Sequence, residues 1–119
     1  MAVRPLVLLV DDDPQMRDLL VTIFSLHGGF RIGGVAVDGF EGAMLAADVQ
    51  PDVVVLDYFM PRWDGERAAH FIREHSSSSK IIAFSAVLGE PPDWADAFLL
   101  KNDISRLVPM IEEMLAPAA

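Results

Sequence analysis

Apolar residues follow two different patterns along this chain, and the two patterns alternate. Short runs rich in valine, leucine and isoleucine carry almost no charge, which is typical of β-strands buried on both faces. Such runs predict strands at residues 6–10, 30–37, 53–57, 80–85 and 98–101. Between them, apolar residues recur every three or four positions, as on one face of a helix. This spacing predicts helices at residues 14–26, 39–49, 65–75 and about 103–115.

Residues that favour helix starts lie at the boundaries of these segments. Asp13 before Pro14 indicates an N-cap followed by proline at the first helical position. Asp64 is the expected N-cap of the third helix, and Asn102 or Asp103 that of the last one. The residues expected on the inner face of the second helix are Phe40, Ala43, Met44 and Ala47.

Strands that alternate with helices imply an α/β fold, in which helices cover both faces of a parallel sheet. With 119 residues, the chain is long enough for one domain with a sizeable core and too short for two. We therefore expect one domain over residues 1–119, with residues 116–119 as a tail or the start of a linker. Right-handed crossovers bring the carboxyl ends of all parallel strands to one edge of the sheet.

Composition narrows the classes of partner. The formal net charge of −9, with nine scattered basic residues, argues against direct nucleic-acid binding by this chain, because such binding uses clustered lysine and arginine. No apolar stretch reaches the roughly 20 residues of a membrane helix. The sequence contains no cysteine, so disulfides and thiolate metal sites are excluded and a reducing cytoplasm fits. We expect a soluble, cytoplasmic protein.

Charged residues follow three of the predicted strands. Asp11 and Asp12 come after the first strand, Asp57 ends the third, and Lys101 ends the fifth. Two carboxylates about 5 Å apart repel by roughly 3 kcal/mol at an effective dielectric constant of about 20. A cation must offset this repulsion, and a small cluster of carboxylate oxygens suits Mg²⁺, or else Mn²⁺. The sequence therefore predicts a metal site at this edge of the sheet.

The same cluster has the composition of a phosphoryl acceptor. A carboxylate such as Asp57 can attack phosphorus if a divalent ion and an ammonium group neutralise the developing charge. Lys101 would supply the ammonium group, and Ser85, at the end of the fourth strand, could donate a hydrogen bond to a phosphoryl oxygen. A simpler role for Ser85 is a hydrogen bond to the backbone.

Taken in order, these motifs resemble the receiver domain of two-component response regulators. The resemblance spans nearly the whole chain. Its motifs are Asp11-Asp12-Asp13-Pro14 with Arg17, Pro51-Asp52 through Asp57, Met60-Pro61, Asp64-Gly65, Ser85-Ala86 and Lys101. It implies a flavodoxin-like (βα)₅ fold, a doubly wound, five-stranded parallel sheet in the order 2-1-3-4-5.

The resemblance also implies a function in signalling. A histidine kinase, a phosphotransfer protein or acetyl phosphate would transfer a phosphoryl group to Asp57, and the affinity for an output protein or effector domain would change. The implied metal ligands are Asp12, Asp57, the backbone carbonyl of Phe59 and, partly through water, Asp11. Such a domain is a phosphoacceptor and not a turnover enzyme.

The resemblance also assigns roles to three residues around the phosphoryl group. Lys101 would bind the phosphoryl group, Ser85 would be the switch hydroxyl and Phe98 the switch aromatic, which turns inward when the hydroxyl moves. An aromatic residue on a buried strand can equally serve only the core. Phe59 and Val87 occupy positions that control the access of water to the phosphate. Because both are apolar, we expect slow hydrolysis.

The segment between Ser85 and Lys101 is shorter than the family pattern. It contains Gly89, Pro91 and Pro92, which disfavour a helix, so we expect a fourth helix that is absent or only a turn around residues 93–97. Receivers commonly signal through the face that includes this helix. We therefore predict a changed partner surface or a mobile segment.

Two other functions stay open at the level of sequence. One is a pseudo-receiver, a binding module that works without phosphorylation, which the short segment after Ser85 favours. The other is an aspartyl-phosphate phosphatase. Phosphatases of the haloacid dehalogenase family place the nucleophile after the first strand, whereas Asp57 follows the third, and little chain is left for a substrate pocket.

Overall fold

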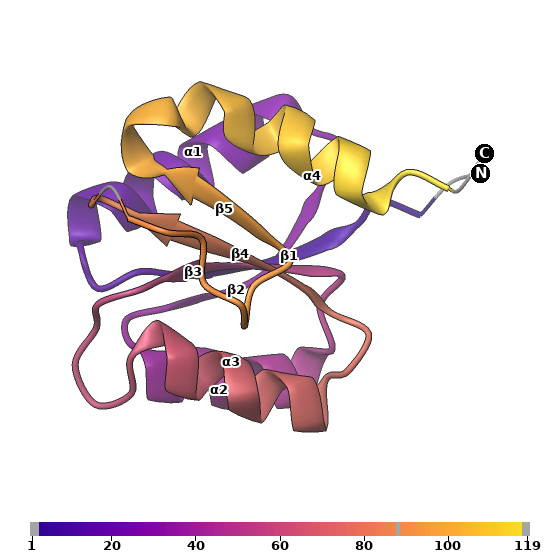
Figure 1. Ribbon diagram of the computed structural model, residues 1–119. Coiled ribbons are helices and arrows are strands. Elements are labelled where there is room, and N and C mark those ends of the chain that lie inside the picture. The colour runs from indigo at the N-terminus through magenta and orange to yellow at the C-terminus, as the bar shows by residue number, and fades with distance from the viewer. Residues whose placement is uncertain (1–2, 88, 118–119) are drawn as a thin grey trace.

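Five parallel strands form one sheet in the computed structural model, which describes residues 3–87 and 89–117 (Figure 1). The strands are β1 (Leu6–Val10), β2 (Arg31–Ala36), β3 (Val53–Asp57), β4 (Lys80–Ser85) and β5 (Ala97–Leu100). Their order across the sheet is β2-β1-β3-β4-β5, and every neighbouring pair is parallel. The predicted flavodoxin-like class and strand order are confirmed.

Helices cover both faces of the sheet (Figure 1). They are α1 (Pro14–His27), α2 (Gly39–Val49), α3 (Gly65–His75), a 3₁₀ helix (Lys101–Arg106) and α4 (Leu107–Leu115). One apolar core lies between the sheet and helices α1 and α4, and a second lies between the sheet and helices α2 and α3. No helix in residues 3–87 or 89–117 combines the length and apolar character needed to span a membrane.

Aspartate side chains begin three of the helices. Asp13 Oδ1 accepts a hydrogen bond from the Gln15 amide at 3.0 Å, and Asp64 Oδ1 accepts one from the Arg67 amide at 2.9 Å. Both caps were expected from the sequence. Asp38, which the sequence analysis did not single out, caps α2 in the same way. These caps fix the helix starts that lie around the carboxyl edge of the sheet.

The inner face of α2 differs from the prediction. Its buried residues are Gly39, Gly42, Ala43 and Ala46, whereas Met44 is exposed and Phe40 and Ala47 are half-buried. Only one of the four expected inner residues is therefore fully buried. The expectation was wrong because it ranked residues by hydrophobicity, whereas α2 packs through its smallest residues. A Cβ atom at Gly42 would lie 2.7 Å from Val10, so only glycine allows this close approach.

The last helix does not begin with a side-chain cap. Neither Asn102 nor Asp103 has the predicted role, because both lie within the 3₁₀ helix, and the residue before α4 is Arg106. Asp103 has φ −99° and ψ 29°, outside the helical range, so the 3₁₀ helix is kinked at this residue. The predicted end near Leu115 is confirmed.

Within the described residues, no helix lies between β4 and β5, and the chain makes only a turn at Asp93 and Trp94. The expected shortening is therefore confirmed. Trp94 is buried in the core beside α3. The Arg73 guanidinium donates hydrogen bonds to the Trp94 carbonyl at 2.9 Å and to the Asp96 carboxylate at 3.0 Å. Side chains thus occupy part of the space between α3 and the sheet edge.

Candidate functional site

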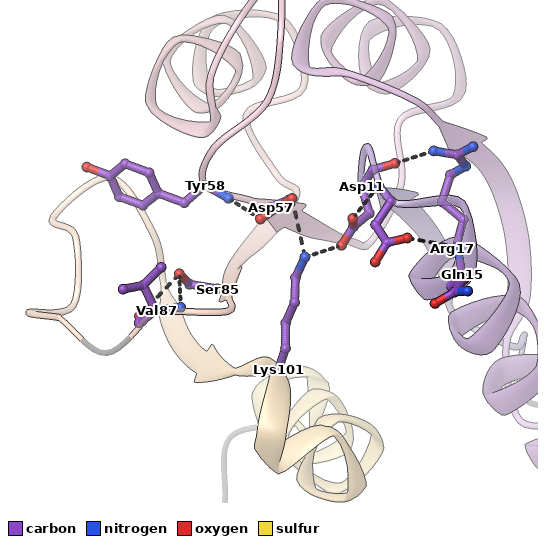
Figure 2. Close-up of polar contacts among 9 residues, drawn as sticks. Asp11, Gln15, Arg17, Asp57, Tyr58, Ser85, Val87 and Lys101 are labelled. Atoms are coloured by element: carbon purple, nitrogen blue, oxygen red, sulfur yellow. Dashed lines mark hydrogen bonds and ion pairs between the residues drawn. The ribbon is translucent and has the colours of Figure 1, made fainter.

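Two buried carboxylates and one ammonium group meet at the carboxyl edge of the sheet (Figure 2). Asp11 follows β1, Asp57 ends the neighbouring strand β3, and Lys101 directly follows β5. Lys101 Nζ lies 2.8 Å from Asp11 Oδ2 and 3.3 Å from Asp57 Oδ2. The sheet therefore brings together the charged residues that the sequence analysis expected to converge.

Backbone groups hold the two carboxylates in place. Asp11 Oδ1 accepts a hydrogen bond from the Asp13 amide at 2.9 Å, and Asp57 Oδ1 accepts one from the Tyr58 amide at 2.8 Å. The Arg17 guanidinium donates to the Asp11 carbonyl at 2.9 Å, which ties α1 to the end of β1. The second oxygen of each carboxylate is left to face Lys101.

The carboxylates have the composition and spacing of a site for a hard cation. One oxygen atom from each of Asp11, Asp12 and Asp57 can be chosen so that all three lie within 4.8 Å of one another. Asp12 is exposed, so the cluster is open to solvent on one side. Lys101 is the only polar group within the described residues that reaches Asp11 Oδ2. Carboxylate oxygens together with water are the ligand set that Mg²⁺ prefers.

One ammonium group does not neutralise two buried carboxylates. Burial and then the negative charge of Asp11 raise the pKa of Asp57 to about 7, although Lys101 acts in the opposite direction. Burial alone would lower the pKa of Lys101. Its hydrogen bonds and charge interactions with Asp11 and Asp57 outweigh that effect, and its pKa is raised. The cluster therefore holds excess negative charge, which a divalent cation would offset.

Ser85 lies at the same edge, but its hydroxyl makes no hydrogen bond to Asp57 in this structure. Its hydroxyl donates to the Val87 carbonyl at 3.3 Å and accepts from the Val87 amide at 3.2 Å (Figure 2). The backbone role considered for this serine is thus the one observed. Phe98 is half-buried and lines a cavity of about 240 Å³ beside Ser85. The other lining residues are Tyr58, Phe59, Val87, Gly89 and Glu90.

The loop from Tyr58 to Asp64 connects Asp57 to α3. The Gly65 amide donates to the Tyr58 carbonyl at 2.8 Å, and a Cβ atom at Gly65 would lie 2.6 Å from the Asp57 carbonyl oxygen. Glycine is needed here because the start of α3 packs directly on the end of β3. The same loop contains Arg62, whose ion pair with Asp38 the sequence analysis did not find.

Comparisons with known proteins agree with one another. The family model described as the response regulator receiver domain matches residues 7–107. The transcriptional regulator RpaA of Synechocystis is 34% identical over 94% of this chain and 46% of its own length. The nitrate/nitrite response regulator NarL of Escherichia coli is 32% identical over 81% of this chain and 47% of its own length. The chain thus spans less than half of these two relatives.

Solved structures show the same fold. A structure of the CheX–CheY–BeF₃–Mg²⁺ complex from Borrelia burgdorferi matches with a TM-score of 0.86 and 28% identity, covering 94% of this chain and 90% of that one. The response regulator domain of Thermotoga maritima CheB matches with a TM-score of 0.84 and 24% identity, covering 97% of this chain and 100% of that one. At 24% identity, the likeness to the CheB domain shows the fold alone.

Proposed function

Since this chain belongs to the response regulator receiver domains, we propose that it accepts a phosphoryl group on Asp57. The donor is a phosphohistidine of a histidine kinase or phosphotransfer protein, or acetyl phosphate. The phosphorylated domain changes its affinity for an output protein or effector domain. It is a phosphoacceptor and not a turnover enzyme. The observation that carries this proposal is the ammonium group of Lys101, which lies within 3.3 Å of both buried carboxylates.

In the proposed reaction, an Asp57 carboxylate oxygen attacks phosphorus. A bond forms between this oxygen and phosphorus, the bond from phosphorus to the donor's imidazole nitrogen breaks, and the imidazole keeps the electron pair. Lys101 follows β5 beside Asp57, where its ammonium group can pair with a phosphoryl oxygen. Burial of the site strengthens this charge interaction, because few water molecules compete with it.

The three clustered carboxylates support a requirement for Mg²⁺, with Mn²⁺ as an alternative ion. Asp11, Asp12, Asp57 and the Phe59 carbonyl would hold it. When bound, the ion would neutralise charge on the carboxylates and on the transferring phosphoryl group. The excess negative charge around Asp57 is the feature of this chain that favours such an ion.

Ser85 and Phe98 are the proposed switch residues. The Ser85 hydroxyl makes hydrogen bonds only to Val87 within the described residues, so a phosphoryl group on Asp57 could compete for it. Phe98 borders the same cavity, and space vacated by Ser85 would be open to its ring. The phosphate thus biases the segment after β4 between two arrangements.

The proposal is tested by the intact mass of the protein after incubation with acetyl phosphate and Mg²⁺. We expect a gain of one phosphoryl group in the wild type, and no gain in Asp57→Asn or when the metal is chelated. No gain in folded wild-type protein that binds Mg²⁺ would favour the pseudo-receiver. Repeated turnover of a phosphate ester would instead favour the phosphatase.

The lifetime of the phosphorylated state gives a further prediction. Phe59 and Val87, which line the cavity beside Ser85, have exposed fractions of 64% and 57% and offer no polar group to a water molecule there. In Phe59→Asn an amide can orient the attacking water, so we expect the phosphate to decay roughly tenfold faster. The decay of the phosphorylated mass after donor removal measures this rate.

Phe59→Leu is the matched control for this measurement, because it keeps an apolar side chain at the same position. We expect its phosphate to decay at nearly the wild-type rate. Slower decay in Phe59→Asn than in the wild type would contradict the role assigned to Phe59.

A further inference from the structure

An ion pair fastens the β3–α3 loop to the start of α2. Arg62 Nε donates to Asp38 Oδ2 at 2.7 Å, and its terminal nitrogen donates to Asp38 Oδ1 at 3.1 Å. The Asp38 side chain is only 9% exposed and also caps α2 by accepting from the Glu41 amide. Such a two-point contact fixes the orientation of both groups, which a single contact does not.

Arg62 adopts a backbone conformation that arginine rarely takes. Its φ of 66° lies in the left-handed region, where glycine and asparagine are common and longer side chains are strained. A strained residue persists only where its surroundings stabilise it, and such residues concentrate at functional sites. Here the ion pair with Asp38 and the Phe40 ring, 4.5 Å from the guanidinium carbon, supply the stabilising contacts.

The loop backbone also rests directly on α2. The Trp63 carbonyl oxygen occupies the space that a Cβ atom would need at Gly39, the first residue of α2. At its other end, the loop is held by the hydrogen bond from the Gly65 amide to the Tyr58 carbonyl. Phe59 lies between these two attachments and carries the carbonyl proposed as a metal ligand.

We infer that Arg62 and Asp38 are positioning residues for the metal site, because their ion pair holds the loop that presents the Phe59 carbonyl. This inference rests on the proposed function, since the carbonyl matters only if the cluster binds a divalent ion. Neither residue belongs to the carboxylate cluster itself. Their effect on metal affinity therefore acts through the shape of the loop.

If charge alone mattered, replacing Arg62 would raise the Mg²⁺ affinity, whereas the positioning role predicts that it falls. Removing a positive charge near an acidic cluster should strengthen the binding of a divalent cation. Removing a residue that positions a ligand should weaken it, even where the substitution relieves backbone strain. Arg62→Gly separates these effects, because glycine adopts a φ of 66° without strain and cannot pair with Asp38. Asp38→Asn removes the same ion pair and keeps a side chain that caps helices well.

The experiment measures Mg²⁺ affinity by titration calorimetry with the full chain. We expect Arg62→Gly and Asp38→Asn each to weaken Mg²⁺ binding by about tenfold, and the double variant to be little weaker than either single one. Arg67→Ala is the matched control, because its guanidinium stacks on the Trp63 ring of the same loop and makes no ion pair with residues 3–87 or 89–117. This control should bind Mg²⁺ as tightly as the wild type, or more tightly.

Hydrogen exchange of the metal-free proteins supplies a second readout. Amides of residues 58–64 should exchange faster in Arg62→Gly and Asp38→Asn than in Arg67→Ala, while the strands stay protected. Arg62→Lys, which keeps the charge without the two-point contact, should give intermediate affinity.

Unchanged or tighter Mg²⁺ binding in Arg62→Gly would overturn the inference and leave the proposed function intact. A wild-type protein that binds no Mg²⁺ would instead overturn the proposed function, and the inference with it.

Discussion

Asp57→Asn is expected to stabilise the metal-free protein at pH 8 by up to about 4 kcal/mol relative to the wild type. Asp57 is buried beside the charge of Asp11, and its pKa is raised from 3.8 to about 7. Above pH 7 the folded protein must therefore hold an ionised carboxylate in an unfavourable place. Asparagine has a similar shape and removes that charge.

The pH dependence has a definite sign. A carboxyl group with a raised folded-state pKa contributes stability that is fully present below pH 3.8 and is lost as the pH rises through about 7. The difference in unfolding free energy between Asp57→Asn and the wild type should therefore grow across this range and level off above it. Urea denaturation in the presence of a chelator at several pH values measures it. A difference that stays constant with pH would contradict the assigned cause.

At pH 8, Mg²⁺ should reduce the difference in unfolding free energy between Asp57→Asn and the wild type. A ligand that binds the folded wild type stabilises it in proportion to RT ln(1 + [L]/Kd). Asp57→Asn lacks one of the proposed ligand charges and should therefore gain less stability from Mg²⁺ than the wild type does. An equal gain in both proteins would show that Asp57 is not part of the metal site.

Trp94→Ala is expected to lower the free energy of unfolding by about 3–5 kcal/mol, because it removes a large side chain from the core. Trp94 is 7% exposed, and its ring packs beside α3, with its centroid 5.6 Å from that of Tyr58. It also lies against the start of α3, since a Cβ atom at Gly65 would be 3.2 Å from the indole. Its removal opens a space that the neighbouring backbone cannot fill.

The measurement is again urea denaturation, with Val87→Ala as the control in the same segment. Val87 is 57% exposed, so its truncation should cost less than about 0.5 kcal/mol. Similar costs for the two variants would mean that Trp94 does not anchor the segment between β4 and β5. Mobility of that segment remains a prediction, which hydrogen exchange would test.

The sequence predicts β1 and β4 with their observed bounds because each is a short apolar run bordered by polar residues. It also predicts that Asp11, Asp57 and Lys101 meet, because parallel strands end at one edge of the sheet. These predictions need only local patterns and the rules of strand connection. The extent of the domain over residues 1–119 stays a prediction.

Features that depend on contacts between distant segments could not be predicted in this way. The ion pair between Asp38 and Arg62 joins two loops, and nothing near either residue indicates its partner. Trp94 had no assigned role, because its burial depends on contacts with Tyr58 and the start of α3, which are distant in the sequence. The buried face of α2 was missed because the size of a residue, and not its hydrophobicity, decided which ones face the sheet.

The contact between Gly39 and the Trp63 carbonyl limits how the protein can be redesigned. Any side chain at residue 39 would push the loop backbone away from α2, whichever residue stands at position 63, because the obstructing atom belongs to the main chain. Mutant libraries designed to alter binding at the carboxyl edge of the sheet should therefore keep Gly39 fixed. They can vary the outward side chains of the loop, but residues 38 and 62 must be changed as a pair.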